Sequence, residues 1–354
     1  MAAFDGVKSK PLWAALAMAL CIAAAPAQAP PRETSAIYLY QGADRQQRLV
    51  DMARKEGSLV LYTSLATTES MPLAQAFEKK YGIKVQLWRA LSESIIQRTI
   101  AEARAQRHSV DVIETNSPEM EALASEDITA EFFSPHFSEL YDWAVPKHRR
   151  WISDRADLWV VGFNTNKVKR EEIPASVEGF LDPKWKGRLA IEATDDDWMA
   201  TLIKTMGEDK GLDFFRKLAA QKPELRKGHV LLAQLVAAGE VPLSLTTYSG
   251  NAESAKKKGA PIDWVTVEPA IGRPQGVGLA KNAPHPHAAL LFADFVLSRE
   301  GAELLSLLGR VPTNRNVETI LNRTKHVMVD PAVILDEAAK WQKLWNELFL
   351  ARGN

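Results

Sequence analysis

The sequence predicts an α/β protein built from two lobes, each with a mostly parallel sheet and flanking helices. Apolar strand-like runs alternate with helix-like segments from residue 58 to residue 124. A second series of the same kind follows between residues 158 and 267. Such alternation is typical of parallel sheets that are covered by helices on both faces. The length of 354 residues favours two domains over one.

Short apolar and β-branched runs predict the strands, and periodic segments between them predict the helices. In the first region the strand-like runs are residues 58–63, 83–88 and 110–113, and the helix-like segments are residues 44–56, 67–81, 91–106 and 117–124. Gly57 and Gly82 each follow a helical segment, where glycine provides the left-handed conformation that ends a helix. Farther along, strands are expected at 158–163, 189–191, 241–246, 262–267 and 276–280, and helices at 197–206, 211–220, 230–238, 248–258, 286–298 and 300–308.

The segment over residues 331–350 predicts a C-terminal amphipathic helix. Trp341, Leu344, Trp345 and Leu348 fall on one stripe of this helix. We expect the stripe to dock on the body of the protein rather than to recruit a partner.

The first 27 residues have the layout of a secretory signal peptide. Lys8 and Lys10 precede a long apolar run, and the small residues Ala25, Pro26 and Ala27 mark a cleavage site at its end. The run is shorter than the ~20 residues that span a bilayer, so release is favoured over a membrane anchor. We therefore expect a mature protein in the periplasm, with a flexible lead-in over residues 28–44.

Composition argues against several classes of function. Lys+Arg and Asp+Glu are both 44, so the formal net charge is zero and nothing indicates nucleic acid as a partner. The single cysteine, Cys21, lies inside the signal, which leaves the mature chain without thiolate ligands or a cysteine nucleophile. The hydrolase motif Gly-x-Ser-x-Gly, the zinc motif His-Glu-x-x-His and the Walker loop are missing, so no enzyme is indicated. A hydrolase built from scattered Ser, His and Asp residues stays open as the rival class.

Eight short segments together resemble one known family, and they run in the family's order along nearly the whole mature chain. They are GSLVLY at 57–62, FEKKYGIKV at 77–85, VDVI at 110–113, GFNTN at 162–166, PKWKGR at 183–188, AAGE at 237–240, PHPHAALLFADF at 284–295 and SREG at 298–301. In these segments the chain resembles the extracellular (periplasmic) solute-binding proteins of ABC importers, in particular the ferric-iron-type branch.

The resemblance implies a two-lobed fold of the periplasmic-binding-protein type II class, whose lobes are joined by crossing hinge strands. Lobe 1 would span residues 45–158 and 275–330, lobe 2 residues 159–274, and a docking helix residues 331–354. The implied function is capture of a small solute between the lobes and delivery to a membrane permease that a cytoplasmic ATPase drives. The resemblance implies no catalysis, and we expect a monomer. A ligand-sensing subunit would use the same fold.

Iron-binding members of this family hold the metal with two adjacent tyrosines, a carboxylate, sometimes a histidine, and a bound anion. At the matching positions this chain has Tyr248-Ser249, Asn116, no histidine within residues 64–67, and an acidic loop over residues 194–197. The comparison implies a small organic or cationic solute rather than ferric iron. The alternative is a metal ion held by Tyr248 and Glu114, and apart from such an ion no cofactor is expected.

Candidate ligand-binding residues lie in the loops after the predicted strands, because ligands of such sheets bind at the carboxyl ends. We expect hydroxyls and an amide to orient the solute, an aspartate with an adjacent indole to bind a cation, and an arginine to clamp a carboxylate. The residues are Thr63, Ser64, Thr67, Asn116, Asp195, Asp197, Trp198, Tyr248, Ser249 and Arg273. Helix capping by the threonine and aspartates, core packing of the tyrosine and a surface salt bridge of the arginine are the structural alternatives.

Overall fold

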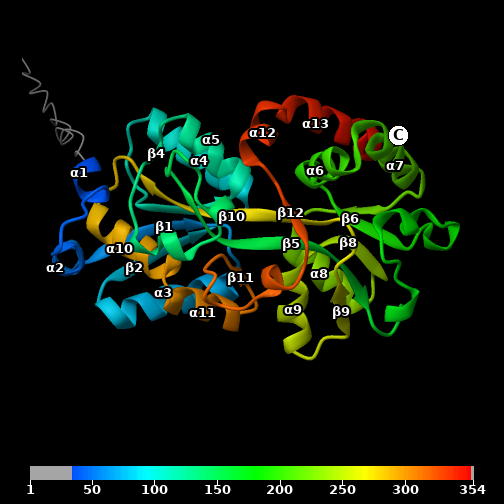
Figure 1. Cartoon of the computed structure of the whole chain (residues 1–354), viewed down its shortest axis with the longest axis horizontal. Coiled ribbons are helices and arrows are strands. Elements are labelled where there is room, and N and C mark those ends of the chain that lie inside the picture. The colour runs from blue at the N-terminus through cyan, green and yellow to red at the C-terminus, as the bar shows by residue number, and fades with distance from the viewer. Residues whose placement is uncertain (1–33, 352–354) are drawn as a thin grey trace, which may run out of the picture. The chain divides into compact units, whose positions relative to one another are not determined.

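The computed structural model describes residues 34–351, so the predicted signal peptide and Cys21 lie outside the described residues. The strands are β1 Ser58–Thr63, β2 Lys84–Arg89, β3 Val112–Asn116, β4 Thr129–Ala130, β5 Ile152–Asn164, β6 Leu189–Glu192, β7 Glu224–Arg226, β8 Leu243–Tyr248, β9 Ile262–Val265, β10 Ala270–Ala280, β11 Val311–Pro312 and β12 His326–Met328. The main path of the sheet runs β2-β1-β3-β10-β5-β8-β6-β7 (Figure 1).

Helices pack around the sheet both at its β2-β1-β3 part and at its β8-β6-β7 part (Figure 1). They are α1 Ser35–Tyr38, α2 Arg45–Glu56, α3 Thr67–Tyr81, α4 Ser92–Arg104, α5 Ser117–Ser125, α6 Asp196–Met206, α7 Glu208–Ala220, α8 His229–Ala238, α9 Ser249–Lys257, α10 Pro286–Leu297, α11 Arg299–Leu307, α12 Pro331–Asp336 and α13 Ala338–Trp345. Short 3-10 turns are η1 Pro135–Glu139, η2 Asp142–Ala144, η3 Arg170–Glu172, η4 Val177–Leu181, η5 Pro183–Trp185 and η6 Ile320–Asn322, and η7 Asn346–Leu350 is a π-helical turn. None of the helices in residues 34–351 combines the length and the apolar character that a membrane span requires.

Two groups of parallel strands define two lobes, as predicted. In lobe 1, β1 pairs in parallel with β2 and β3, and in lobe 2, β6 pairs in parallel with β7 and β8. The long strands β5 and β10 are antiparallel to each other and connect the groups (Figure 1). Separate apolar cores fill the lobes, one around Phe77 and Phe292 and the other around Trp185 and Phe215. Because β5 and β10 serve both lobes, the boundaries at residues 158 and 274 stay a prediction.

The chain begins and ends several elements where the sequence predicts. β1 spans residues 58–63 and α3 spans residues 67–81, both as expected. Gly57 ends α2 with φ 75° and Gly82 ends α3 with φ 76°, the left-handed conformation that glycine adopts without steric cost. These turns direct β1 and β2 into the same sheet.

Both connecting strands are longer than predicted. β5 starts at Ile152 rather than residue 158, and β10 starts at Ala270 rather than residue 276. The extra part of β5 contains Asp154, Arg155 and Asp157, whose charges look like a loop in the sequence although all three side chains are buried. Their charges are paired inside the protein, which allows a charged segment to form a buried strand.

The described part of the lead-in over residues 28–44 is folded, which corrects the expectation of a flexible segment there. Residues 35–38 form α1, and the Tyr38 hydroxyl donates to the Ala280 carbonyl over 3.1 Å. The Thr34 hydroxyl donates to the Lys281 carbonyl over 2.6 Å. Tyr38 has no solvent exposure. Burial of Tyr38 in the core of lobe 1 and these hydrogen bonds attach the segment to lobe 1.

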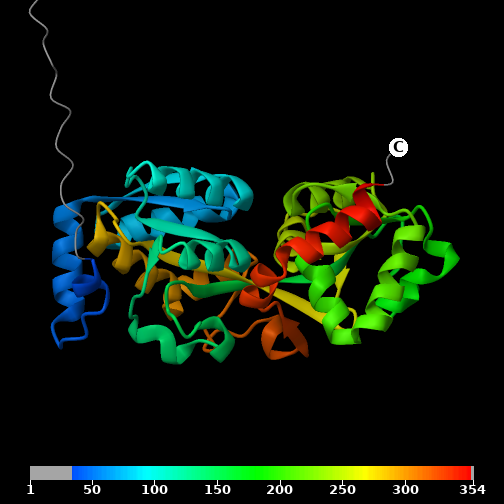
Figure 2. The same cartoon turned by 90° about the horizontal axis from the view of Figure 1, so that it is seen from above.

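The C-terminal segment is helical but interrupted. The sequence predicts one helix over residues 331–350, whereas the structure divides it into α12, α13 and η7. Trp341 and Trp345 are buried in the lobe 2 core, and the Trp345 indole donates to the Ala193 carbonyl over 2.8 Å. Figure 2 shows α13, in red, against the helices of lobe 2, and it contacts α6 there. The preceding α12 packs against α5 of lobe 1, so the segment contacts both lobes.

Candidate functional site

A cavity of about 750 Å³ is lined by residues of both lobes. Six helices begin at its wall: α3, α4 and α5 from lobe 1, and α6, α8 and α9 from lobe 2. Most of them follow the carboxyl end of a strand, the position at which open α/β sheets bind ligands. Residues of α12 and α13, such as Ile334 and Gln342, complete the wall. The fold therefore places a ligand-sized cavity where the sequence analysis expects it.

Several of the predicted ligand-binding residues line this cavity. They are Ser64, Thr67, Asn116, Asp197, Tyr248 and Arg273. Thr67 is exposed at the start of α3, whose N-cap residue is Ala66, so the capping alternative does not describe this threonine. The Asn116 side chain donates to Glu119 over 3.4 Å. These residues remain candidates for ligand contact.

Four other predicted ligand residues are outside the wall, and each has a structural reason. The Thr63 hydroxyl donates to Glu114 over 2.7 Å and is fully buried. Asp195 is also fully buried behind the wall, and Ser249 is buried beside Tyr248. Trp198 packs edge to face on Phe215 in the lobe 2 core, so its indole does not offer a face to a cation in the cavity. Burial of the large apolar indole of Trp198 in the core is more favourable than its exposure in a solvent-filled cleft.

Arg273 is held too firmly by protein groups to act as the predicted carboxylate clamp. Its guanidinium forms ion pairs with Asp197 and Asp195, and its Nη1 donates to the Tyr248 hydroxyl. The guanidinium carbon lies 4.7 Å from the ring centre of Trp159. Only 6% of Arg273 is exposed, so the alternative of a surface salt bridge is also wrong. Arg273 instead fixes the two aspartates of the α6 loop to β10.

The same arrangement occurs at two more arginines of the wall. Arg155 on β5 lies between Glu114 and Asp154. Arg310 lies between Glu69 and Asp157, at 3.5 and 3.4 Å. Each buried group has one positive charge and two carboxylates, so it carries a net negative charge when both acids are ionised. Burial raises the pKa of Asp154 to about 7, with the charge of Glu114 adding to the shift and that of Arg155 opposing it.

Two further carboxylates in the wall have no basic partner within the part of the chain that the structure describes. Glu119 lies in the first turn of α5 and Asp196 in the first turn of α6, so they come from opposite lobes. Burial raises the pKa of Glu119 to about 7, although Arg273 acts against the shift. Burial and then the charge of Asp197 raise the pKa of Asp196 to about 7. Neither acid forms an ion pair within residues 34–351, although the helix N-terminus on which each lies favours the ionised form.

Arg89, at the end of β2, is the contrasting basic residue of the wall. It has no carboxylate partner among residues 34–351, and its Nη2 lies 3.5 Å from the Ser64 carbonyl. Its Nε is buried and has no hydrogen-bond partner there. Gln275 on β10 also lines the cavity, and its buried Nε2 has no partner either. Buried donors without a partner are uncommon in folded proteins, so Arg89 and Gln275 are candidate donors to an oxygen of a ligand.

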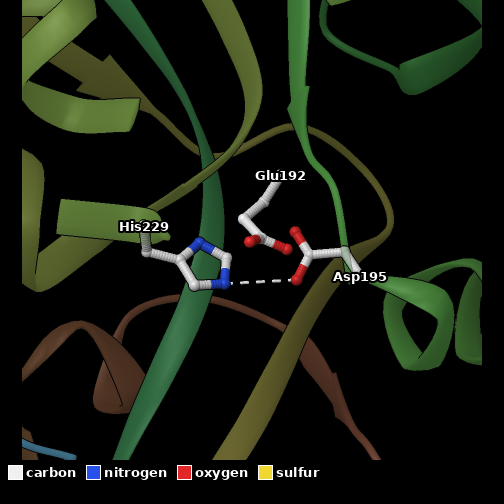
Figure 3. A group of neighbouring side chains, drawn as sticks. All are labelled: Glu192, Asp195 and His229. Atoms are coloured by element: carbon white, nitrogen blue, oxygen red, sulfur yellow. Dashed lines mark ion pairs between the residues drawn. The ribbon is translucent and has the colours of Figure 1, made fainter. Parts of the chain in front are cut away.

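A compact polar group lies behind Tyr248 in lobe 2. Figure 3 shows Glu192, Asp195 and His229 pointing toward one another, and their ligand atoms lie within 4.8 Å. The His229 Nε2 is 3.2 Å from Asp195, while its Nδ1 is 3.1 Å from the Thr246 carbonyl. Burial opposes the charged imidazolium, but Asp195 and Glu192 outweigh it and the pKa of His229 is raised. With both ring nitrogens facing acceptors, His229 is suited to be an imidazolium, or a metal ligand through Nε2.

The structure does not bring together the predicted metal ligands Tyr248 and Glu114. Glu114 is buried outside the wall, where it binds Arg155 and Thr63. The Tyr248 ring stacks on His229 with centroids 3.5 Å apart, and its hydroxyl accepts from Arg273. Burial raises the pKa of the Tyr248 phenol well above its usual value. This pair is therefore a poor set of ligands for ferric iron.

Several residues of the wall have no clear signal in the sequence. Arg89, Glu119 and His229 occur singly in segments that look like an ordinary strand end and two ordinary helix starts. Acidic residues are common in the first turn of helices in all proteins, so the sequence alone does not distinguish Glu119 as a site residue. Position after a predicted strand is the one signal that could have selected Arg89.

Comparison with known proteins identifies the family. The family described as "Bacterial extracellular solute-binding protein" matches residues 110–345. "Iron uptake protein A1" of Synechocystis is 27% identical over 297 residues, which cover 76% of this chain and 81% of that protein. Iron-bound HitA from Pseudomonas aeruginosa has a TM-score of 0.72 at 23% identity, over 82% of this chain and 99% of that one. The periplasmic binding protein AfuA from Actinobacillus pleuropneumoniae, with fructose-6-phosphate bound, has a TM-score of 0.73 at 24% identity, over 83% and 99%.

These similarities confirm the predicted two-lobed periplasmic-binding-protein fold. The family match also confirms the expected role of an extracellular solute-binding protein. The similar proteins differ in what they bind, so the ligand has to be inferred from this chain's own cavity. The chain belongs to the bacterial extracellular solute-binding protein family.

Proposed function

We propose that this protein captures a small organic cation in the periplasm and hands it to the membrane permease of an ABC importer. The lobes would close around the solute through the connecting strands β5 and β10, and the solute would leave unchanged. A solute that binds the closed form better than the open form shifts the population toward it.

The excess of carboxylates over basic groups, counted in the cavity wall together with the buried carboxylates directly behind it, carries this proposal. Arg155, Arg273 and Arg310 are each matched by two carboxylates, and Glu119 and Asp196 have no basic partner among the described residues. Buried negative charge without compensation is costly, so a cation that enters the cavity gains more than an anion does. Glu119 and Asp196 lie on opposite lobes, and a cation between them would favour closure.

Ferric iron bound through tyrosinate is less well supported in this chain. The family's second tyrosine position is Ser249, and the Tyr248 hydroxyl already accepts from Arg273. The iron named for the similar proteins is therefore not our proposal for this one.

Thermal unfolding against a panel of solutes tests the proposal. The panel contains quaternary ammonium ions and primary amines, matched neutral alcohols, carboxylates, phosphate and ferric citrate. We expect an organic cation to raise the unfolding temperature, since a ligand at 100 times its Kd adds about 2.7 kcal/mol of stability. Stabilisation by phosphate or carboxylates without any response to cations would contradict the proposal.

A divalent metal ion is the second candidate ligand, because Glu192, Asp195 and His229 offer two carboxylates and an imidazole within 4.8 Å. This donor set suits an ion such as Zn²⁺ or Mn²⁺. Titration of the purified protein with each ion, compared with a His229→Gln variant, distinguishes the two candidates. Binding that the variant loses, without any response to organic cations, would favour the metal.

A further inference from the structure

We propose that the captured solute is a zwitterion, whose carboxylate binds Arg89 and whose cationic group binds Glu119. This inference rests on the proposed function, because it names the solute class for the same cavity. The inference adds that the cationic solute also has a carboxylate, and that this carboxylate binds Arg89 of lobe 1.

The pairing of the wall arginines carries the first step. Three of them are matched by two carboxylates each, so their charge is already used within the protein. Arg89 has no acidic partner in the described part of the chain, and it lines the same cavity. An arginine has five donors in a fork that fits a carboxylate, and the structure occupies Arg89 only through one 3.5 Å contact to a carbonyl. Arg89 is therefore the wall arginine that can still receive an anion.

Gln275 provides a second, independent observation. Gln275 lines the cavity with only 2% of its surface exposed, and its buried amide Nε2 has no hydrogen-bond partner among residues 34–351. Gln275 lies opposite Asn116 in the β10–β3 pair, so the amide is at the edge of lobe 1. A neutral donor costs little to bury beside an oxygen acceptor and favours an oxygen-bearing ligand over a simple amine.

The topology places the two charges at a distance that one small molecule can bridge. Arg89 on β2 is level with Thr63 on β1, and Thr63 is level with Glu114 on β3. Because neighbouring strands are about 4.8 Å apart, β2 and β3 lie roughly 10 Å apart at this edge. Glu119 follows β3 in the first turn of α5. Both side chains extend into the cavity wall, so a solute with separated charges can contact both.

The experiment measures binding of ω-amino acids from 3-aminopropanoate to 6-aminohexanoate at pH 8 by calorimetry, each beside its methyl ester and its N-acetyl derivative. The ester keeps only the cation and the acetyl derivative only the anion. We expect at least one zwitterion to bind about tenfold to hundredfold more tightly than either derivative, the gain of a hydrogen-bonded charge pair. Arg89→Gln should remove the preference for the zwitterion over its ester, and Glu119→Gln should weaken both.

Matched controls are Arg216→Gln and Glu240→Gln, which change exposed residues outside the cavity wall. An ester that binds the wild-type protein as tightly as its zwitterion, or an Arg89→Gln variant that keeps the preference, would overturn the inference and leave the proposed function standing. The proposed function itself would fail if the acetyl derivatives bound and the esters did not. No binding by any amino acid or ester would overturn the inference, and the quaternary ammonium ions and amines of the solute panel would then decide the proposed function.

Discussion

Two kinds of charged side chain line the cavity. Arg155, Arg273 and Arg310 are each fixed between two carboxylates, whereas Arg89 and Glu119 have no partner of opposite charge among residues 34–351. The fixed groups connect β5 and β10 to neighbouring elements, and the unpaired groups are available to a solute. The difference teaches that a charged residue in a binding cavity indicates the charge of the ligand only if it forms no ion pair within the protein. The predictions below test this division, from the largest expected effect to the smallest.

The largest effect is expected when a fixed arginine is removed. Arg155→Met leaves Glu114 and Asp154 buried without a counter-ion, so we expect the free energy of unfolding to fall by about 3–5 kcal/mol. Urea unfolding followed by circular dichroism measures the change. Arg89→Gln is the matched control and should stay within about 0.5 kcal/mol of the wild type. Equal losses in the two variants would erase the distinction between fixed and unpaired arginines.

Glu119→Gln should lower the affinity for the solute while the stability of the fold is retained. The carboxylate has no basic partner to lose, so the fold should tolerate the amide. We expect the affinity for an organic cation to fall by about 1.5–3 kcal/mol, the contribution of a hydrogen bond to a charged group. Calorimetry with a cation selected from the solute panel measures it. Unchanged affinity would show that the unpaired acid is not part of the site.

Affinity for a cation should depend on pH near neutrality. The pKa of Glu119 is raised to about 7 by burial, with Asp197 adding to the shift and Arg273 opposing it. Only the ionised carboxylate attracts a cation, so affinity should be full above pH 8 and fall as pH decreases through 7, by at most about tenfold per unit. The Glu119→Gln variant should show a smaller step, which Asp196 leaves because its pKa is also raised to about 7. A wild-type profile that is flat between pH 6 and 8 would refute the assignment.

The smallest effect is expected at the rim. Lys227 of lobe 2 and Glu93 of lobe 1 form a 2.8 Å ion pair whose side chains are about half exposed. Exposed pairs contribute only about 0.2–1 kcal/mol and are screened by salt. Lys227→Ala should therefore weaken solute binding less than fivefold at low salt and not at all at 1 M NaCl. A loss as large as that of Glu119→Gln would place Lys227 among the binding residues.

Apolar patterns made most of the fold predictable. β1 and α3 occur at their predicted residues because their boundaries are set locally, by an apolar run and by glycines with positive φ. β5 was predictable only in its apolar half. The half with Asp154, Arg155 and Asp157 resembles a loop until its partners Glu114 and Arg310 are known, and both are distant in the sequence.

The candidate site was less predictable than the fold, because the direction of each side chain determines whether it lines the cavity. Ser64 and Thr67 line the cavity, but Thr63 is buried one residue earlier, since alternate strand residues point to opposite faces. In the α6 loop, Asp197 lines the cavity while Asp195 and Trp198 are turned into the protein. A single sequence gives the position of such a loop but not the orientation of each side chain within it.

A structure of the protein with the solute that co-purifies from the periplasm tests the central claim most directly. The account predicts a solute nitrogen within about 3.2 Å of the Glu119 carboxylate, hydrogen-bonding distance. A metal ion coordinated by the Tyr248 phenolate, or a phosphate bound in the cavity with Glu119 left uncontacted, would contradict it.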